Sequence, residues 1–139
     1  MAKSPSHRLF PITFLASIAL SSSACFVAAA GVGAGGAVYV TERDVESQVS
    51  ASVEATYDAV KRTFRDLNIT EGKYATEQDG NREERTLTGK TDDRDVTVKV
   101  KSEGSGSRLS VTVRRDEVIW DRKLARTILD RIIRQTETK

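Results

Sequence analysis

The sequence predicts an α+β fold, a two-layer sandwich in which an antiparallel sheet carries two helices on one face. Apolar residues recur every three or four positions over about 50–68 and again over about 118–135, and at every second position between 96 and 113. The first spacing is typical of a helix with one buried stripe, and the second is typical of a strand with one buried face. Because one-sided elements bury their apolar sides against each other, we expect both helices to cover the same face of the sheet.

The predicted elements follow one another in the order β-α-β-β-β-β-α. Residues 38–41 form a β-branched and aromatic run that predicts the first strand. Ser50 or Ser52 can cap the first helix, because a hydroxyl accepts a hydrogen bond from a free backbone N–H. The apolar stripe of this helix consists of Val53, Tyr57, Val60, Phe64 and Leu67.

Four strands are predicted between the helices. A turn over 78–81 separates two weak strands at about 69–77 and 85–90, and a turn over 91–94 leads into a clear hairpin. The hairpin alternates Val96, Val98 and Val100 on one strand with Leu109, Val111 and Val113 on the other, around a Gly/Ser loop over 102–107.

The closing helix is predicted over about 118–135. Asp116, Glu117 and Asp121 lie at its start, where the helix dipole favours acidic residues. Trp120 lies on its apolar arc, and we expect Tyr57, Tyr74 and Trp120 in the core or at its edge.

The first forty residues have the layout of an export signal. Lys3 and Arg8 are their only charged residues, and the apolar run 9–20 is followed by small residues up to Cys25. This run is shorter than the ~20 residues that a membrane-spanning helix needs. The sequence therefore predicts a leader over 1–24, an Ala/Gly-rich tether over 25–37 and an α+β domain over 38–139.

The end of this leader looks like a bacterial lipobox, made of Ser22, Ser23, Ala24 and Cys25. In such a motif the cysteine thiol receives a diacylglycerol and the leader is cut before it. Ser22 departs from the motif, which usually has Leu there. Two alternatives stay open: an uncleaved helix through the uncharged stretch 9–41, with Gly31 and Gly35 at a helix-pairing face, and ordinary cleavage that leaves Cys25 free. Lys3 and Arg8 predict a domain outside the cytoplasm in each case.

The composition excludes most site chemistry. Beyond Cys25 the chain has no histidine, proline, methionine or further cysteine, so it lacks the residues of a Ser-His-Asp triad, a Cys-His pair or an ordinary zinc site. We expect no catalytic residues, no metal and no cofactor. The G-x-G-x-x-G match over 31–36 follows an export signal instead of a strand, so no nucleotide is expected, and the balanced charge after residue 40 argues against nucleic acid.

The charged residues form two groups that are candidates for a site. Asp92, Asp93 and Asp95 are interpreted as a solvated turn and not as a cation site. A carboxylate-dependent hydrolase remains an alternative that requires scattered acids to converge in the fold. The candidate interaction face, for lipid headgroups or an acidic partner, consists of Arg114, Arg115, Arg122, Lys123 and Arg126. Sheet edges without proline are further sites for strand addition.

Four segments together resemble a family of bacterial lipoproteins: Cys25 with its small neighbours, 37–40, 59–67 and 128–132. The family is catalogued as domain of unknown function 3568. The resemblance implies a lipid-anchored, periplasm-facing module of the cell envelope, and Phe26 in place of Asp after the cysteine points to the outer membrane. It supplies no catalytic residues. We therefore expect a non-catalytic binding or structural lipoprotein whose partners are membrane lipid, through acylated Cys25, and an envelope protein.

Overall fold

The computed structural model describes residues 38–138. The predicted leader and tether, residues 1–37, lie outside the described residues. The described residues therefore cover the predicted α+β domain except for its last residue.

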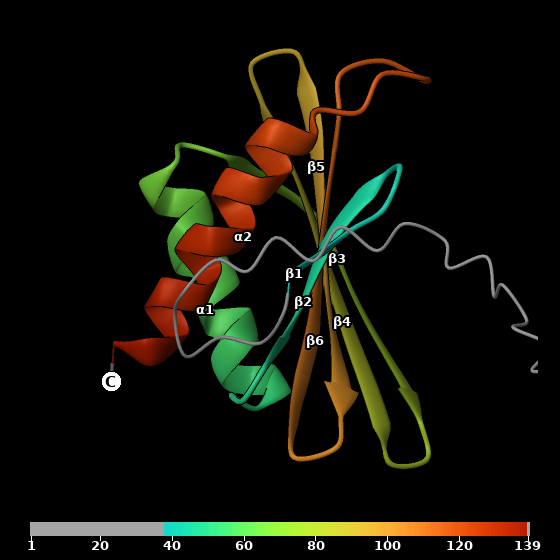
Figure 1. Cartoon of the computed structure of the whole chain (residues 1–139), viewed down its shortest axis with the longest axis vertical. Coiled ribbons are helices and arrows are strands. Elements are labelled where there is room, and N and C mark those ends of the chain that lie inside the picture. The colour runs from blue at the N-terminus through green and yellow to red at the C-terminus, as the bar shows by residue number, and fades with distance from the viewer. Residues whose placement is uncertain (1–37, 139) are drawn as a thin grey trace, which may run out of the picture.

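The domain is a six-stranded antiparallel sheet with two helices on one face, which confirms the predicted fold class (Figure 1). The strands lie in the order β1-β2-β6-β5-β4-β3 across the sheet. The helices are α1 (Val53–Asp66) and α2 (Arg122–Glu137). The strands are β1 (Val38–Val40), β2 (Asp44–Val49), β3 (Thr70–Asp79), β4 (Arg82–Thr91), β5 (Arg94–Glu103) and β6 (Gly106–Arg114).

Strand β2 is an addition to the predicted elements, which placed no strand between residue 41 and the first helix. It lies between β1 and β6 and pairs with both. Its side chains alternate, with Val45, Ser47 and Val49 buried on the helix side. The middle buried position is a serine, so the apolar alternation that identifies a strand is interrupted there.

The core lies between the helices and one face of the sheet. In β5 and β6 the predicted apolar residues face the helices, and Val98 lies opposite Val111, which in turn pairs with Val45. Helix α1 begins after Ser52, whose hydroxyl accepts a hydrogen bond from the N–H of Ala55, as predicted. Phe64 of α1 and Ile128 and Leu129 of α2 are fully buried against these strands.

Tight two-residue turns join the strands from β3 to β6. Gly80, Asp92 and Gly104 each occupy the first turn position with φ between 50° and 58°. This positive φ suits the primed turns that match the twist of antiparallel hairpins. The connection predicted as a loop over 102–107 is therefore mostly strand, and only Gly104 and Ser105 separate β5 from β6.

Helix α2 begins later than predicted, at Arg122. Residues 115–118 form a bend, and the backbone around Trp120 then pairs with the end of β6: Arg115 N–H donates to Ile119 O, and Asp121 N–H donates to Val113 O. Asp121 then caps the helix. Asp116 and Glu117 thus lie outside the helix, and Trp120 is not on its apolar arc but pairs with Arg114 across an isolated β-bridge.

The two tyrosines have different environments. Tyr57 is buried in the core, as predicted. Tyr74 is 58% exposed, so it lies not in the core but at its edge, the second of the two predicted places. It lies on edge strand β3, and its ring contacts that of Tyr57 with 5.6 Å between centroids.

Neither of the helices described here is long and apolar enough to cross a bilayer.

Gly89 generates the first prediction. A Cβ at this position of β4 would lie 2.7 Å from Cε2 of Phe64 and 2.8 Å from the carbonyl oxygen of Thr70. At an open strand position, replacing glycine by alanine usually raises the free energy of unfolding, by ~0.5–1 kcal/mol. Here we expect the opposite sign, because the buried ring of Phe64 has to move: Gly89→Ala should lower the free energy of unfolding by about 1–3 kcal/mol. Urea denaturation measures this change.

The control is Thr86→Ala, which changes an outward-facing residue of the same strand and should alter stability by less than ~0.5 kcal/mol. A Gly89→Ala variant as stable as the natural chain would contradict the close packing of β4 on α1.

Candidate functional site

The face of the sheet away from the helices carries charged and hydroxyl side chains, and part of it is hollowed into a groove. We call this side the open face. The groove has a volume of about 470 Å³. It is lined by Arg43, Asp44, Glu46, Glu84, Lys99, Lys101, Arg108, Ser110, Thr112 and Trp120. Strands β2, β6, β5 and β4 supply most of these side chains, through the residues that alternate with the buried ones.

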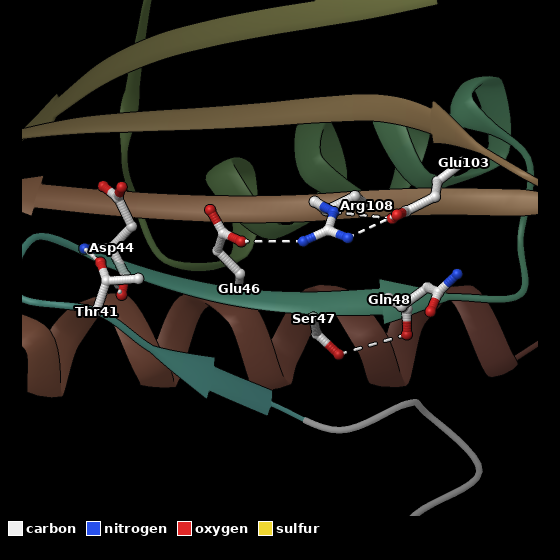
Figure 2. A network of polar contacts seen from close by, with 7 residues as sticks. All are labelled: Thr41, Asp44, Glu46, Ser47, Gln48, Glu103 and Arg108. Carbon is white, nitrogen blue, oxygen red and sulfur yellow. Dashed lines mark hydrogen bonds and ion pairs between the residues drawn. The ribbon is translucent and has the colours of Figure 1, made fainter. Parts of the chain in front are cut away.

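At one side of the groove, a guanidinium lies between two carboxylates. Arg108 of β6 binds Glu103 with two hydrogen bonds, of 2.8 Å from Nε and 2.6 Å from Nη2. Its Nη1 lies 3.5 Å from Oε2 of Glu46 on β2. Figure 2 shows the guanidinium between these two carboxylates. A single guanidinium thus pairs with two carboxylates.

The same contacts set the ionisation of this cluster. The hydrogen bonds that Arg108 donates to Glu103 lower the pKa of the Glu103 carboxyl, and the same bonds raise the pKa of Arg108. Both groups are therefore charged over the physiological range of pH.

The other side of the groove has a surplus of positive charge. Lys99 and Lys101 of β5 lie 3.8 and 3.9 Å from the carboxylate of Glu84 on β4. Both ammonium groups are about half exposed, whereas the Glu84 side chain is about one-quarter exposed. The lysines can therefore bind a second anion without losing Glu84.

An aromatic side chain contributes to the groove beside Asp44. The guanidinium of Arg43 lies 5.7 Å from the ring centroid of Trp120. Asp44 accepts a hydrogen bond of 2.5 Å from the hydroxyl of Thr112. Asp44, at the start of β2, thus contacts β6, and its neighbour Arg43 contacts the segment that follows β6.

The groove is suited to binding an extended polar segment that carries charges of both signs. Paired side chains fix the positions of its own charges, and the Trp120 ring offers an apolar contact. For the part of the chain that the structure covers, His, Cys, Asp and Glu side chains form no group of three or more that suits a metal ion.

The structure distributes the sequence-predicted site residues over different surfaces. Ser22, Ser23, Ala24 and Cys25 lie outside the described residues. Arg114 is on the open face, 3.4 Å from Asp95, whereas Arg115 is 3.2 Å from Asp93. Arg122, Lys123 and Arg126 lie on α2, in the other layer, where Arg126 pairs with Asp130 at 3.3 Å. The five basic residues therefore do not form one continuous face.

Sequence reasoning missed most of the groove. The alternation of β5 and β6 does place Lys99, Lys101 and Arg108 on the solvent side, and this was the available signal. Glu46 and Trp120 could not be assigned, because β2 was not predicted and Trp120 was placed on a helix. Glu46 contacts Arg108, and Trp120 contacts Arg43, because β2 lies beside β6 in the sheet.

A second, smaller hollow of about 330 Å³ lies where α1 ends and α2 begins. Arg94 crosses it, and its guanidinium lies 2.9 Å from Asp121 and 3.3 Å from Asp93. The N–H of Leu124 and the charge of Arg94 both lower the pKa of Asp121. These ion pairs join the sheet to the start of α2. Because their charges neutralise one another, we assign this hollow a structural role.

The fold and the groove define a class: a small α+β protein whose helices cover one face of a sheet and leave a charged face open. Within this class, residues 8–135 match the family described as "Protein of unknown function (DUF3568)", and the chain belongs to that family. Comparison with curated proteins gave no match.

The cap of α2 generates a prediction on pH dependence. Because the folded state lowers the pKa of Asp121, this carboxylate stabilises the fold above its unfolded pKa of ~3.9, and the contribution is lost as the pH falls through the folded pKa. Asp121→Asn keeps a capping side chain but loses the charge that faces Arg94. We expect this variant to be less stable by about 1 kcal/mol at pH 7 and to match the natural chain at pH ~2.

Urea midpoints at the two pH values measure the effect. Asp116→Asn makes the same charge change at an exposed loop residue and should shift neither midpoint. An Asp121→Asn deficit that persists unchanged at low pH would show that the carboxylate charge is not what stabilises the cap.

Proposed function

We propose that this protein is a non-catalytic lipoprotein of the bacterial cell envelope, anchored through Cys25 and facing the periplasm, at the outer membrane. In this proposal the groove of the open face binds a segment of another envelope protein. The observation that carries it is the groove itself, which is lined by four basic and three acidic side chains and in which Lys99 and Lys101 share the single carboxylate of Glu84.

The anchor rests on the sequence and on physical reasoning about acyl chains. A basic start, a short apolar run and small residues before a lone cysteine support lipidation. Two or three acyl chains, at ~0.8 kcal/mol per buried CH₂, hold a protein on a bilayer essentially irreversibly. The tether over 25–37 would then connect the lipid to β1.

A carboxylate-dependent hydrolase is the second candidate, and one observation favours it. Asp44, Glu46 and Glu84 line the same groove, so acids distant in sequence do converge. Each of the three already has a partner: Thr112, Arg108 and the two lysines, respectively. A general base needs a lone pair directed at substrate, so this arrangement supports binding more than catalysis.

The anchor is tested by mass spectrometry of the protein extracted from membranes. We expect an amino-terminal peptide that begins at acylated Cys25, and no acyl mass in a Cys25→Ser variant. Ser22→Leu restores the usual lipobox residue and should raise the processed fraction. Recovery of an intact Met1 terminus from the natural chain would refute lipidation and support an uncleaved membrane helix.

The groove is tested by charge reversal. Lys99→Glu combined with Lys101→Glu should reduce cross-linking to an envelope partner in intact cells by about tenfold or more, because truncating or reversing a few central contacts removes most binding energy. Both lysines are about half exposed, so the fold should be retained, which circular dichroism checks.

The matched control is Arg122→Glu combined with Lys123→Glu, which makes the same charge change on exposed positions of α2. If the cross-linked species still forms with the groove variant but not with this control, the partner binds the helical layer and not the groove. The absence of any discrete cross-linked species with the natural chain would remove the support for a protein partner.

A further inference from the structure

The edge strand β3 is long and uncovered. It forms one border of the sheet, and all ten of its residues are exposed. The opposite border, β1, has only three residues. An edge strand presents unpaired N–H and C=O groups, so an edge of this length is a template for another strand.

The sequence of β3 is complementary to itself. A β-bulge lies between Glu71 and Tyr74, and the strand pairs regularly with β4 from Tyr74 to Asp79. Lys73 lies in the bulge, directly before this segment, and the acids Glu77 and Asp79 lie at the end of the segment. When a second copy runs antiparallel, the basic start of one strand meets the acidic end of the other.

We propose that β3 pairs with β3 of a second copy of this chain, antiparallel and centred on Thr76. This register places Tyr74 opposite Gln78 and Lys73 opposite Asp79, and the symmetry makes each contact twice. Opposite charges that face each other across strands are favourable, and like charges are not.

Each neighbouring register with the same hydrogen-bond alternation places like charges opposite each other. The register centred on Ala75 places Glu71 opposite Asp79, and the attraction of Lys73 for Glu77 only offsets this repulsion. The register shifted in the other direction places Glu77 opposite its own copy. The register centred on Thr76 therefore avoids like charges in direct opposition, and all its pairs except Lys73 with Asp79 lie in the regular segment after the bulge.

The exposed Tyr74 fits the same arrangement. Its ring lies on the helix side, against Tyr57, and the rest of its surface is in solvent. In the paired sheet, Gln78 of the other copy covers it across the strands, with Thr76 beside it. A single strand pair buries much less than a stable dimer interface, so we expect a weak dimer whose fraction rises with concentration.

Disulfide trapping tests the axis of the pair. In a full-length chain that carries Cys25→Ser, Thr76→Cys provides the only thiol. The Cα atoms of directly opposed antiparallel residues are ~4.5–5.5 Å apart, within the range of a disulfide. We expect mild oxidation to yield a covalent dimer. Thr86→Cys, on β4 opposite Ala75, is one strand further from the axis and should remain monomeric.

Sedimentation analysis of the full-length chain with and without charge changes tests the register. Lys73→Glu and Asp79→Lys should each weaken dimerisation about tenfold, and the double variant should recover it, because the attraction is restored with reversed signs. Arg131→Glu, on an exposed position of α2, is the charge control and should have no effect.

A chain that stays monomeric up to about 1 mM, where even weak specific association is detectable, overturns the proposal. A dimer that forms without trapping at position 76 and without response to the charge changes also overturns it, because another surface then carries the association. These outcomes do not depend on lipidation or on the groove partner, since the test chain lacks Cys25 and its groove is unchanged.

Discussion

The strict alternation of β5 and β6 is the constraint on which the rest of the structure depends. On one side of these two strands, valines and leucine are fully buried beneath the helices. On the other side, Lys99, Lys101 and Arg108 point to solvent. A shift of one residue in register would exchange the two sets, placing lysines under the helices and valines in water. The core and the groove are therefore two results of one pairing.

The same alternation explains what could be predicted from the sequence. Elements with uninterrupted periodicity, such as the β5–β6 hairpin and α1, were recovered together with the cap at Ser52. Strand β2 was not, because the buried Ser47 breaks its apolar pattern. Trp120 was misplaced because its spacing fits the helical pattern, whereas backbone bonds to the end of β6 hold it beside Arg114, before the helix begins. Strand β2 and Trp120 both line the groove, so the sequence indicated individual charged residues and not the groove that they form.

The ion pairs of the groove contribute little to folding. Exposed pairs are worth about 0–1 kcal/mol, because water and salt screen them and the side chains lose freedom when they pair. The core between the helices and the sheet supplies the stability instead. The pairs do fix where each charge lies, so a partner meets a prearranged surface and does not pay for ordering long side chains. The core thus provides stability, and the ion pairs prepare the groove for binding.

The two proposed contact surfaces are compatible, because one is a face of the sheet and the other is an edge. Edge-to-edge pairing of β3 continues the sheet, and its two-fold axis is perpendicular to the strands and to the sheet plane. Both helical layers then lie on one side of the extended sheet, and both grooves open on the other. Two grooves on one surface can bind a repeated or dimeric partner with a higher effective affinity than either alone. Anchoring both copies in one membrane would raise their local concentration, so a contact as small as a single strand pair becomes significant where the protein acts.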